Sequence, residues 1–120
     1  MLNQTIANTQ EIPRSHWVDF FNQLTQQSRG RRYTLEICNA DMGVQTLAKH
    51  ATLSSITCDP LQKGDDIVIS AGLETLSFSH IVSHPTALWV AQDLQASPIA
   101  LEILDAENTK TILRFEEGAS

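Results

Sequence analysis

Residues 12–30 form the stretch with the clearest helical period, and they restrict what the rest of the chain can do. Four bulky apolar residues, Trp17, Phe20, Phe21 and Leu24, are spaced i, i+3, i+4 and i+7, so a helix would carry them on one side. Burying them would stabilise the fold by about 6 to 12 kcal/mol. This helix therefore needs a surface on which to pack.

Two further residues mark the ends of this helix. Pro13 suits a first turn, where its missing N–H costs nothing, and Gly30 can adopt the left-handed conformation that ends a helix. We therefore predict one N-terminal amphipathic helix, and we expect the remaining chain to supply the sheet that it covers.

Short segments after residue 30 alternate apolar and polar side chains with a period of two, which is typical of half-buried strands. Turn residues separate them, and no second helical period is present to allow parallel crossovers. The predicted strands are 32–38, 44–49, 53–58, 66–71, 76–83, 87–92 and the two arms of a closing hairpin. The fold class predicted is α+β, with the helix packed on a strongly curved or barrel-like antiparallel β-meander of six to eight short strands.

The closing hairpin can be predicted in more detail. If Leu101 and Ile103 share a face with Thr111, the connecting loop must hold an odd number of residues. A three-residue loop, 106–108, satisfies this condition, with a type I turn opening at Asp105. Asn108 would then take the left-handed position, and Ile103 would lie opposite Thr111.

Charge is distributed unevenly along the chain. Residues 1–63 hold six basic and five acidic side chains, whereas residues 64–120 hold two basic and nine acidic ones. Because phosphate binding needs a continuous basic face, we expect no nucleic-acid partner and no anionic membrane surface. The one basic cluster, Arg29, Arg31 and Arg32, is expected to serve the helix end, with an anionic partner as the alternative.

We expect a single cytoplasmic domain over residues 12–120, preceded by a disordered polar lead-in over residues 1–11. The lead-in has neither the basic nor the apolar region of a secretory signal. Cys38 and Cys58 are the two cysteines, and without a leader they are expected to stay reduced. The longest apolar run, 87–91, is too short to span a bilayer.

The candidates for chemistry are few. His80 and His84 form an H-x-x-x-H pattern, but on a strand their Cα atoms would lie roughly 13 Å apart, too far to share a metal. We therefore expect no metal and no cofactor. We interpret His80 as a core histidine or, alternatively, as the polar group of a ligand-binding site. His84 is interpreted as a turn residue or as a second member of that site. Motifs typical of phosphate loops, serine hydrolases and zinc proteases are absent from the sequence.

Trp89 is the most informative aromatic residue of the predicted strands. It shares one face of its strand with Ala87 and Ala91, while Leu88 and Val90 occupy the other face. One interpretation is a strand covered on both sides, with the helix as a candidate cover. The other is an exposed interface patch formed by Trp89, Ala87 and Ala91, joined by the off-core residues Ile81, Leu104 and Ile112.

The chain resembles a family of short bacterial proteins, domain-of-unknown-function family 5335, over residues 12–115. The resemblance rests on Ile12-Pro13 before a helix with Trp17, on Leu53, Ile56 and Asp59, on His80, Val82 and Pro85, and on the closing LEILDAENTKTILRF. Asn108 stands where glycine would be expected, and both residues tolerate a left-handed turn. The resemblance implies no assigned activity, substrate or cofactor.

Three functions follow as hypotheses. The first is a non-enzymatic protein-interaction or self-association domain, such as a homodimer, whose surface includes Trp89. The second is a small-molecule-binding domain that uses the interior or mouth of the curved sheet near His80. The third is an enzyme that uses His80 and His84 together with an acid, and we favour a non-enzymatic protein over it.

Overall fold

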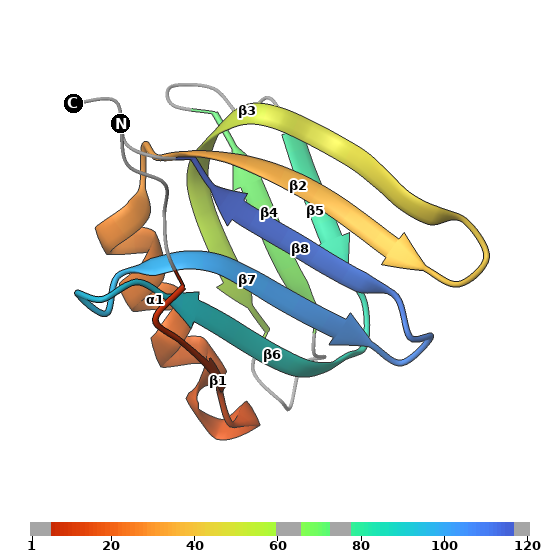
Figure 1. Cartoon of the computed structure of the whole chain (residues 1–120), viewed down its shortest axis with the longest axis horizontal. Helices are drawn as coiled ribbons and strands as arrows, with labels where there is room; N and C mark the ends of the chain where they lie inside the picture. Colours follow the sequence, from red (N-terminus) through yellow and green to blue (C-terminus); the bar gives the residue numbers. More distant parts are fainter. Residues whose placement is uncertain (1–5, 60–65, 73–77, 117–120) are drawn as a thin grey trace.

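The computed structural model describes residues 6–59, 66–72 and 78–116, and these residues form an α+β fold with one short α-helix and eight strands (Figure 1). In chain order the elements are β1 (Asn8–Glu11), the 3₁₀ turn η1 (Arg14–His16), α1 (Trp17–Ser28), β2 (Arg32–Asn39), β3 (Gly43–Cys58), β4 (Ile67–Ala71), β5 (Phe78–Val82), β6 (Pro85–Gln92), β7 (Pro98–Asp105) and β8 (Lys110–Phe115).

All strand pairings within the described residues are antiparallel, and the sheet order is β1-β6-β7-β8-β2-β3-β4-β5. This confirms the predicted antiparallel sheet and the number of strands. The barrel-like alternative is wrong, because the sheet is open: β1 and β5 are its two edges. The chain leaves β5 through Ser83 and His84 and enters β6, which pairs with β1 and β7 instead of β5.

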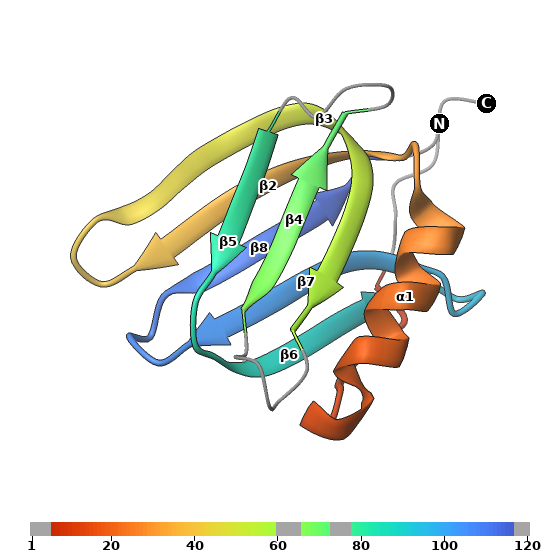
Figure 2. The same cartoon turned by 180° about the vertical axis from the view of Figure 1, so that it is seen from behind.

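The sheet folds into two layers, and the long strand β3 runs from one layer into the other. Its first part pairs with β2 and its last part pairs with β4, with a register shift between Leu53 and Ser55. Figures 1 and 2 show β4 and β5 on one side of the molecule and β6, β7, β8 and β2 on the other. The predicted strands 44–49 and 53–58 are therefore one strand. A bulge bends a strand without ending it, and it interrupts the alternation that marks a strand in the sequence.

The helix begins later than predicted and is not the first element of the chain. The backbone N–H of Ile12 donates to the Leu88 carbonyl at 2.8 Å, so residue 12 still belongs to the sheet edge. Pro13 then precedes η1 with an extended ψ of 146°, and α1 starts at Trp17. The end follows the prediction: the helix stops at Ser28, and Gly30 has a positive φ of 91°.

Helix α1 fills one side of the space between the layers (Figure 2). Trp17, Phe21 and Leu24 are fully buried in the core, and Phe20 packs half-buried against it. The Trp17 indole N–H donates to the Ile12 carbonyl at 2.8 Å, which anchors the first turn. The structure thus buries three of the four side chains that defined the helix in the sequence and half-buries the fourth.

Strand β1 lies in the segment that was expected to be a disordered lead-in, so that prediction is wrong for Asn8–Glu11. The strand pairs with β6 from Asn8 opposite Gln92 to Glu11 opposite Trp89. All four side chains of β1 are exposed, so the strand is held by backbone hydrogen bonds and left no hydrophobic pattern to detect. Residues 1–5 lie outside the described residues.

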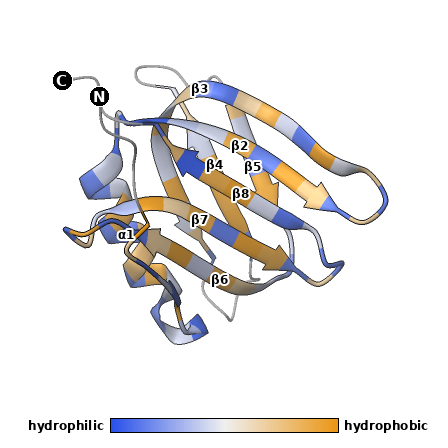
Figure 3. Cartoon of the chain, in the orientation of Figure 1, coloured by the Kyte–Doolittle hydropathy of each residue, from blue (hydrophilic) through white to orange (hydrophobic). Residues whose placement is uncertain are grey.

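The β7–β8 hairpin has the predicted register. Ile103 lies opposite Thr111, and Asn108 has a φ of 64°. Figure 3 shows β7 as mostly hydrophobic, but burial alternates along both strands, with Leu101, Ile103 and Leu113 buried on the inner face. This hairpin therefore supplies the interior with one regular apolar surface.

The predicted basic cluster serves the fold just beyond the helix. The Arg29 side chain donates to the Ser54 carbonyl at 3.1 Å, and Arg31 donates to the Pro98 carbonyl at 3.0 Å. The Arg31 guanidinium also lies 4.0 Å from the centre of the Phe115 ring. Burial lowers the pKa of Arg31, while Asp93 opposes that shift. Within the described part of the chain, no helix has the length and apolar character needed to cross a membrane.

Candidate functional site

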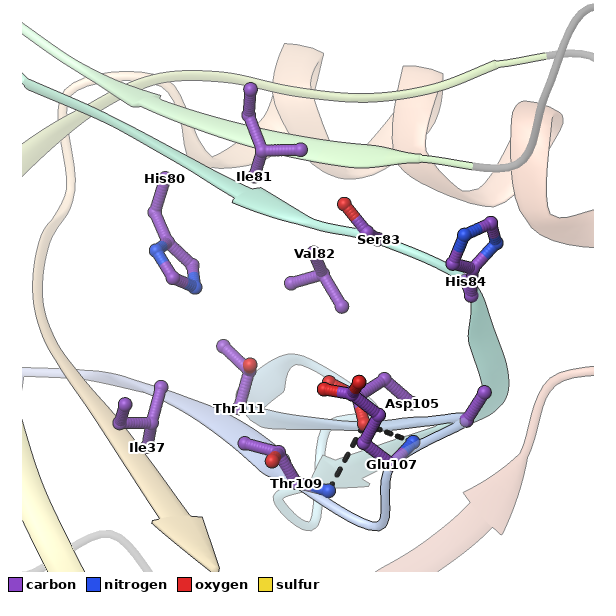
Figure 4. A pocket seen from close by; sticks show the side chains of 11 residues that line it. Ile37, His80, Ile81, Val82, Ser83, His84, Asp105, Glu107, Thr109 and Thr111 are labelled. Atoms are coloured by element: carbon purple, nitrogen blue, oxygen red, sulfur yellow. Dashed lines mark hydrogen bonds between the residues drawn. The ribbon is translucent and has the colours of Figure 1, made fainter.

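A pocket of about 380 Å³ opens on the side of the molecule opposite α1, between β5 and the β7–β8 loop (Figure 4). We call it the His80 pocket. Its lining is contributed by β5 and the corner that follows it, by the β7–β8 loop with the start of β8, and by β2: His80, Ile81, Val82, Ser83, His84, Asp105, Ala106, Glu107, Thr109, Thr111 and Ile37.

His80 comes from the middle of β5 and is half-buried. In Figure 4 its ring points across the pocket toward Thr111 and Ile37, which form the opposite wall. Burial lowers the pKa of His80, so the imidazole is neutral at pH 7. It makes no hydrogen bond to any other described residue. A neutral ring with both nitrogens available can accept one hydrogen bond from a ligand and donate another.

His84 lies at the other end of the pocket, in the corner between β5 and β6 (Figure 4). Its backbone has a φ of 54°, a left-handed conformation that histidine adopts more readily than most residues. The His84 carbonyl accepts a hydrogen bond from the Ala106 N–H at 3.0 Å, which ties this corner to the β7–β8 loop. His84 therefore shapes the pocket through its backbone as well as lining it.

Asp105 and Glu107 bring two carboxylates to the pocket from the β7–β8 loop. One carboxylate oxygen of Asp105 accepts the backbone N–H groups of Glu107 and Thr109, at 2.9 and 3.0 Å. These bonds fix Asp105 within the turn, whereas the Glu107 side chain is exposed at the rim. Asp105 and Glu107 are the acidic residues of the described lining, and it contains no lysine or arginine.

The sequence analysis named His80 and His84 but not the acids that the fold brings beside them. Asp105 entered it only as a turn residue, and Thr111 only as an inward-facing strand position. Both interpretations are correct, and the hairpin register was available in the sequence. The missing information was that β5 lies over the β7–β8 loop, which no local pattern records.

The proposed interface residues divide between two surfaces. Trp89 and Ala91 lie on the outer face of the sheet and line a hollow of about 360 Å³ together with Ile6 and Ile112. Ala87 is on the same strand, opposite Leu104. Ile81 belongs to β5 and lines the His80 pocket instead.

The surroundings of Trp89 show how far its strand is covered. Leu88 and Val90 are buried on the inner face of β6, while Trp89 is 36% exposed. On that outer face Ala91 is buried and Ile6 is 58% exposed, so the face is partly covered, and no residue of α1 lines the hollow beside Trp89. The tryptophan is available to a partner molecule.

In the part of the chain that the structure describes, no group of three or more histidine, cysteine or acidic residues is arranged to hold a metal ion. Extended backbone separates His80 from His84, as expected for a strand, and Figure 4 places their rings at opposite ends of the pocket. The chemistry open to this site is hydrogen bonding by a neutral imidazole and attraction of positive charge by the two carboxylates.

Comparison with known proteins gives a consistent answer. An uncharacterized protein of Aquifex aeolicus (strain VF5) is 26% identical over 108 residues, which cover 90% of this chain and 92% of that protein. No solved structure gives a significant match. A sequence model described as a family of unknown function, DUF5335, matches residues 8–120 and thus confirms the resemblance found in the sequence. The chain belongs to the DUF5335 family.

Proposed function

We propose that this protein is a non-enzymatic binding domain and that the His80 pocket holds a ligand bearing a protonated amine. The observation that carries this proposal is the position of His80: a neutral, half-buried imidazole without a hydrogen-bond partner among the described residues, facing a pocket with two carboxylates. Polar groups inside a concave site that the protein leaves unpaired are typical of ligand recognition.

The charges favour an amine over other polar ligands. Asp105 and Glu107 attract a positive charge, and no basic side chain of the described lining opposes it. An anionic ligand would meet two like charges in the same space. Ile37 and Val82 add apolar contact surface, so the amine should carry a short alkyl chain.

The arrangement gives less support to catalysis. A general base is normally oriented by a second group, as the aspartate orients the histidine of a catalytic triad. His80 has no such partner among the described residues, and the bonded carboxylate oxygen of Asp105 is engaged by two backbone N–H groups of its own turn. Binding therefore accounts for the pocket more simply than turnover does.

NMR titration with n-butylamine tests the proposal, with 1-butanol and butyrate as the neutral and anionic controls of similar size. We expect the ring signals of His80 to shift with the amine and to stay unchanged with both controls. Equal shifts with 1-butanol would contradict the role of charge, and an unchanged His80 ring would contradict the site itself.

Replacing one carboxylate measures its share in binding. Glu107→Gln should weaken n-butylamine binding about two- to fivefold, the range expected for a solvent-exposed ion pair. Glu102→Gln is the matched control, because Glu102 lies on the outer face near Trp89 and outside this pocket. A similar loss in both variants would point to the net charge of the protein rather than to the site.

Self-association is a second candidate function, and the exposed Trp89 on the outer sheet face favours it. Trp89→Glu would place a charge in the hollow that it shares with Ile6. Sedimentation of the wild type should then show a dimer and that of the variant a monomer. A monomeric wild type would remove this candidate and leave the pocket proposal intact.

A further inference from the structure

The two edges of the sheet are protected to different degrees. Strand β1 is four residues long, ends in Glu11 and is followed closely by Pro13. A short length, a charge and a proline are the features by which proteins prevent pairing with a further strand. Edge β1 is therefore poorly suited to accept one.

Strand β5 is also short, at five residues, but it lacks the other two protections. It runs Phe78, Ser79, His80, Ile81 and Val82, without proline or a permanent charge, and its pairing with β4 contains no register shift. Its other side forms no strand pairing with any described residue. Ile81 is 55% exposed on the face turned away from Val82, so an apolar side chain lies open beside this edge. Edge β5 is therefore better suited than β1 to accept a further strand.

This edge and the pocket coincide. The lining of the His80 pocket includes consecutive residues from His80 to His84, so the pocket runs along the end of β5. A strand added about 4.8 Å from β5 would lie against its mouth. Because side chains alternate, every second residue of that strand would point inward beside His80 and Val82, and the others would lie near Ile81.

We propose that the natural ligand of the His80 pocket is an extended segment of a partner protein, which pairs with the free edge of β5 and places one lysine or arginine side chain in the pocket. This inference rests on the proposed function, since it takes the amine to be part of a polypeptide. Main-chain hydrogen bonds supply affinity in this mode of recognition, and pockets for alternate side chains supply specificity.

The pocket suits a long basic side chain. Ile37 and Val82 can contact its aliphatic stem, and the charged end can reach Asp105 and Glu107 at the β7–β8 loop. On the outside, Ile81 offers contact to an apolar residue next to the basic one. The expected partner segment therefore alternates a basic residue with β-branched apolar residues over about five positions, matching the length of β5.

A peptide titration separates this inference from the proposal on which it rests. The probe is a blocked peptide of about seven residues with alternating valine and threonine around a central lysine. We expect it to bind at least about tenfold more tightly than N-acetyl-lysine amide, because only the peptide can form backbone bonds. We also expect replacement of its lysine by norleucine to weaken binding about tenfold.

Backbone methylation supplies the matched control for strand pairing. In an added strand, only alternate N–H groups face β5. N-methylation at those positions should abolish binding, whereas N-methylation at the positions between them should leave it within about twofold. Hydrogen exchange should also slow at those amides of β5 that face away from β4.

The possible results have distinct meanings. Equal affinity of the peptide and N-acetyl-lysine amide would overturn strand pairing while leaving the amine pocket in place. A uniform effect of N-methylation at every position would also overturn strand pairing. Tight binding of the norleucine peptide would overturn the requirement for a basic residue. Absence of binding by the peptide, N-acetyl-lysine amide and n-butylamine would overturn both proposals.

Discussion

The space between the two layers ends differently on its two sides. On one side α1 closes it with Trp17, Phe21 and Leu24, all fully buried. On the other side the His80 pocket leaves it open, with a histidine and two carboxylates in its lining. The difference is that a helix packs its apolar side chains into one side, whereas β5 and the β7–β8 loop border the other.

Residues that pair across neighbouring strands form rows of side chains on the inner face. Two adjacent rows differ in polarity, so the change from the closed side to the open side is local. Leu101, Leu113 and Leu35 form one row across β7, β8 and β2, and all three are buried. Two residues along each strand, the corresponding row contains Thr111, a buried polar residue between Ile103 and Ile37. A single row thus separates a surface that excludes water from one that can bind a polar ligand.

The largest expected effect on stability comes from removing an aromatic side chain on the side that α1 closes. We expect Trp17→Ala to lower the free energy of unfolding by about 3 to 5 kcal/mol, because it removes a fully buried indole and its hydrogen bond to Ile12. Urea denaturation followed by circular dichroism measures the change. Val18→Ala, on the exposed side of the same helix, should change it by less than about 0.5 kcal/mol. A Trp17→Ala protein as stable as the wild type would show that the helix side is not the tighter one.

A polar contact at the helix side should have the next largest effect. The Thr25 hydroxyl accepts the Ile56 N–H at 3.0 Å and donates to the Ile56 carbonyl at 3.1 Å, so it joins α1 to β3. Thr25→Val keeps the shape but leaves both backbone groups unpaired, and we expect a loss of about 1 to 3 kcal/mol in unfolding free energy. Thr46→Val, at an exposed position of β3, is the matched control. If both variants unfold at the same urea concentration, Thr25 does not dock the helix.

The pocket side should give the smallest effect, and it should depend on pH. Burial lowers the pKa of His80 in the folded protein, whereas the unfolded chain takes up the proton near its usual value of about 6.5. Stability should therefore be complete above that pH and decline as the pH falls toward the lower, folded pKa.

His80→Gln should remove this part of the pH dependence, which urea denaturation at a series of pH values between about 7 and 5 would measure. Asn22→Gln, at an exposed helix position without a titratable group, should leave the dependence as in the wild type. A steeper decline in the His80→Gln protein would mean that the pocket favours the charged ring.

Sequence reasoning was most successful where the structure depends on neighbouring residues. The spacing of Trp17, Phe21 and Leu24 identified the helix, and the parity of the closing loop gave the register of Ile103 against Thr111. Both patterns have periods of a few residues. Such short periods show which face of its helix or strand each side chain occupies.

Features that depend on distant pairing could not be obtained in this way. Strand β1 is entirely exposed and owes its existence to β6, about eighty residues further along the chain, so its own side chains carry no signal. The openness of the sheet and the presence of His80 and Asp105 in one pocket depend on how β5 is placed over the β7–β8 loop. Alternation within β5 does not determine that position.

The bend in β3 has a consequence for how the domain comes apart. Its sixteen residues pass from one layer to the other without interruption, so neither layer can lose its order without disturbing a strand of the other. Denaturation should consequently proceed as a single cooperative transition, with equal calorimetric and van't Hoff enthalpies. A partner that steadies β5 would, through β4 and β3, raise the melting temperature of the entire molecule.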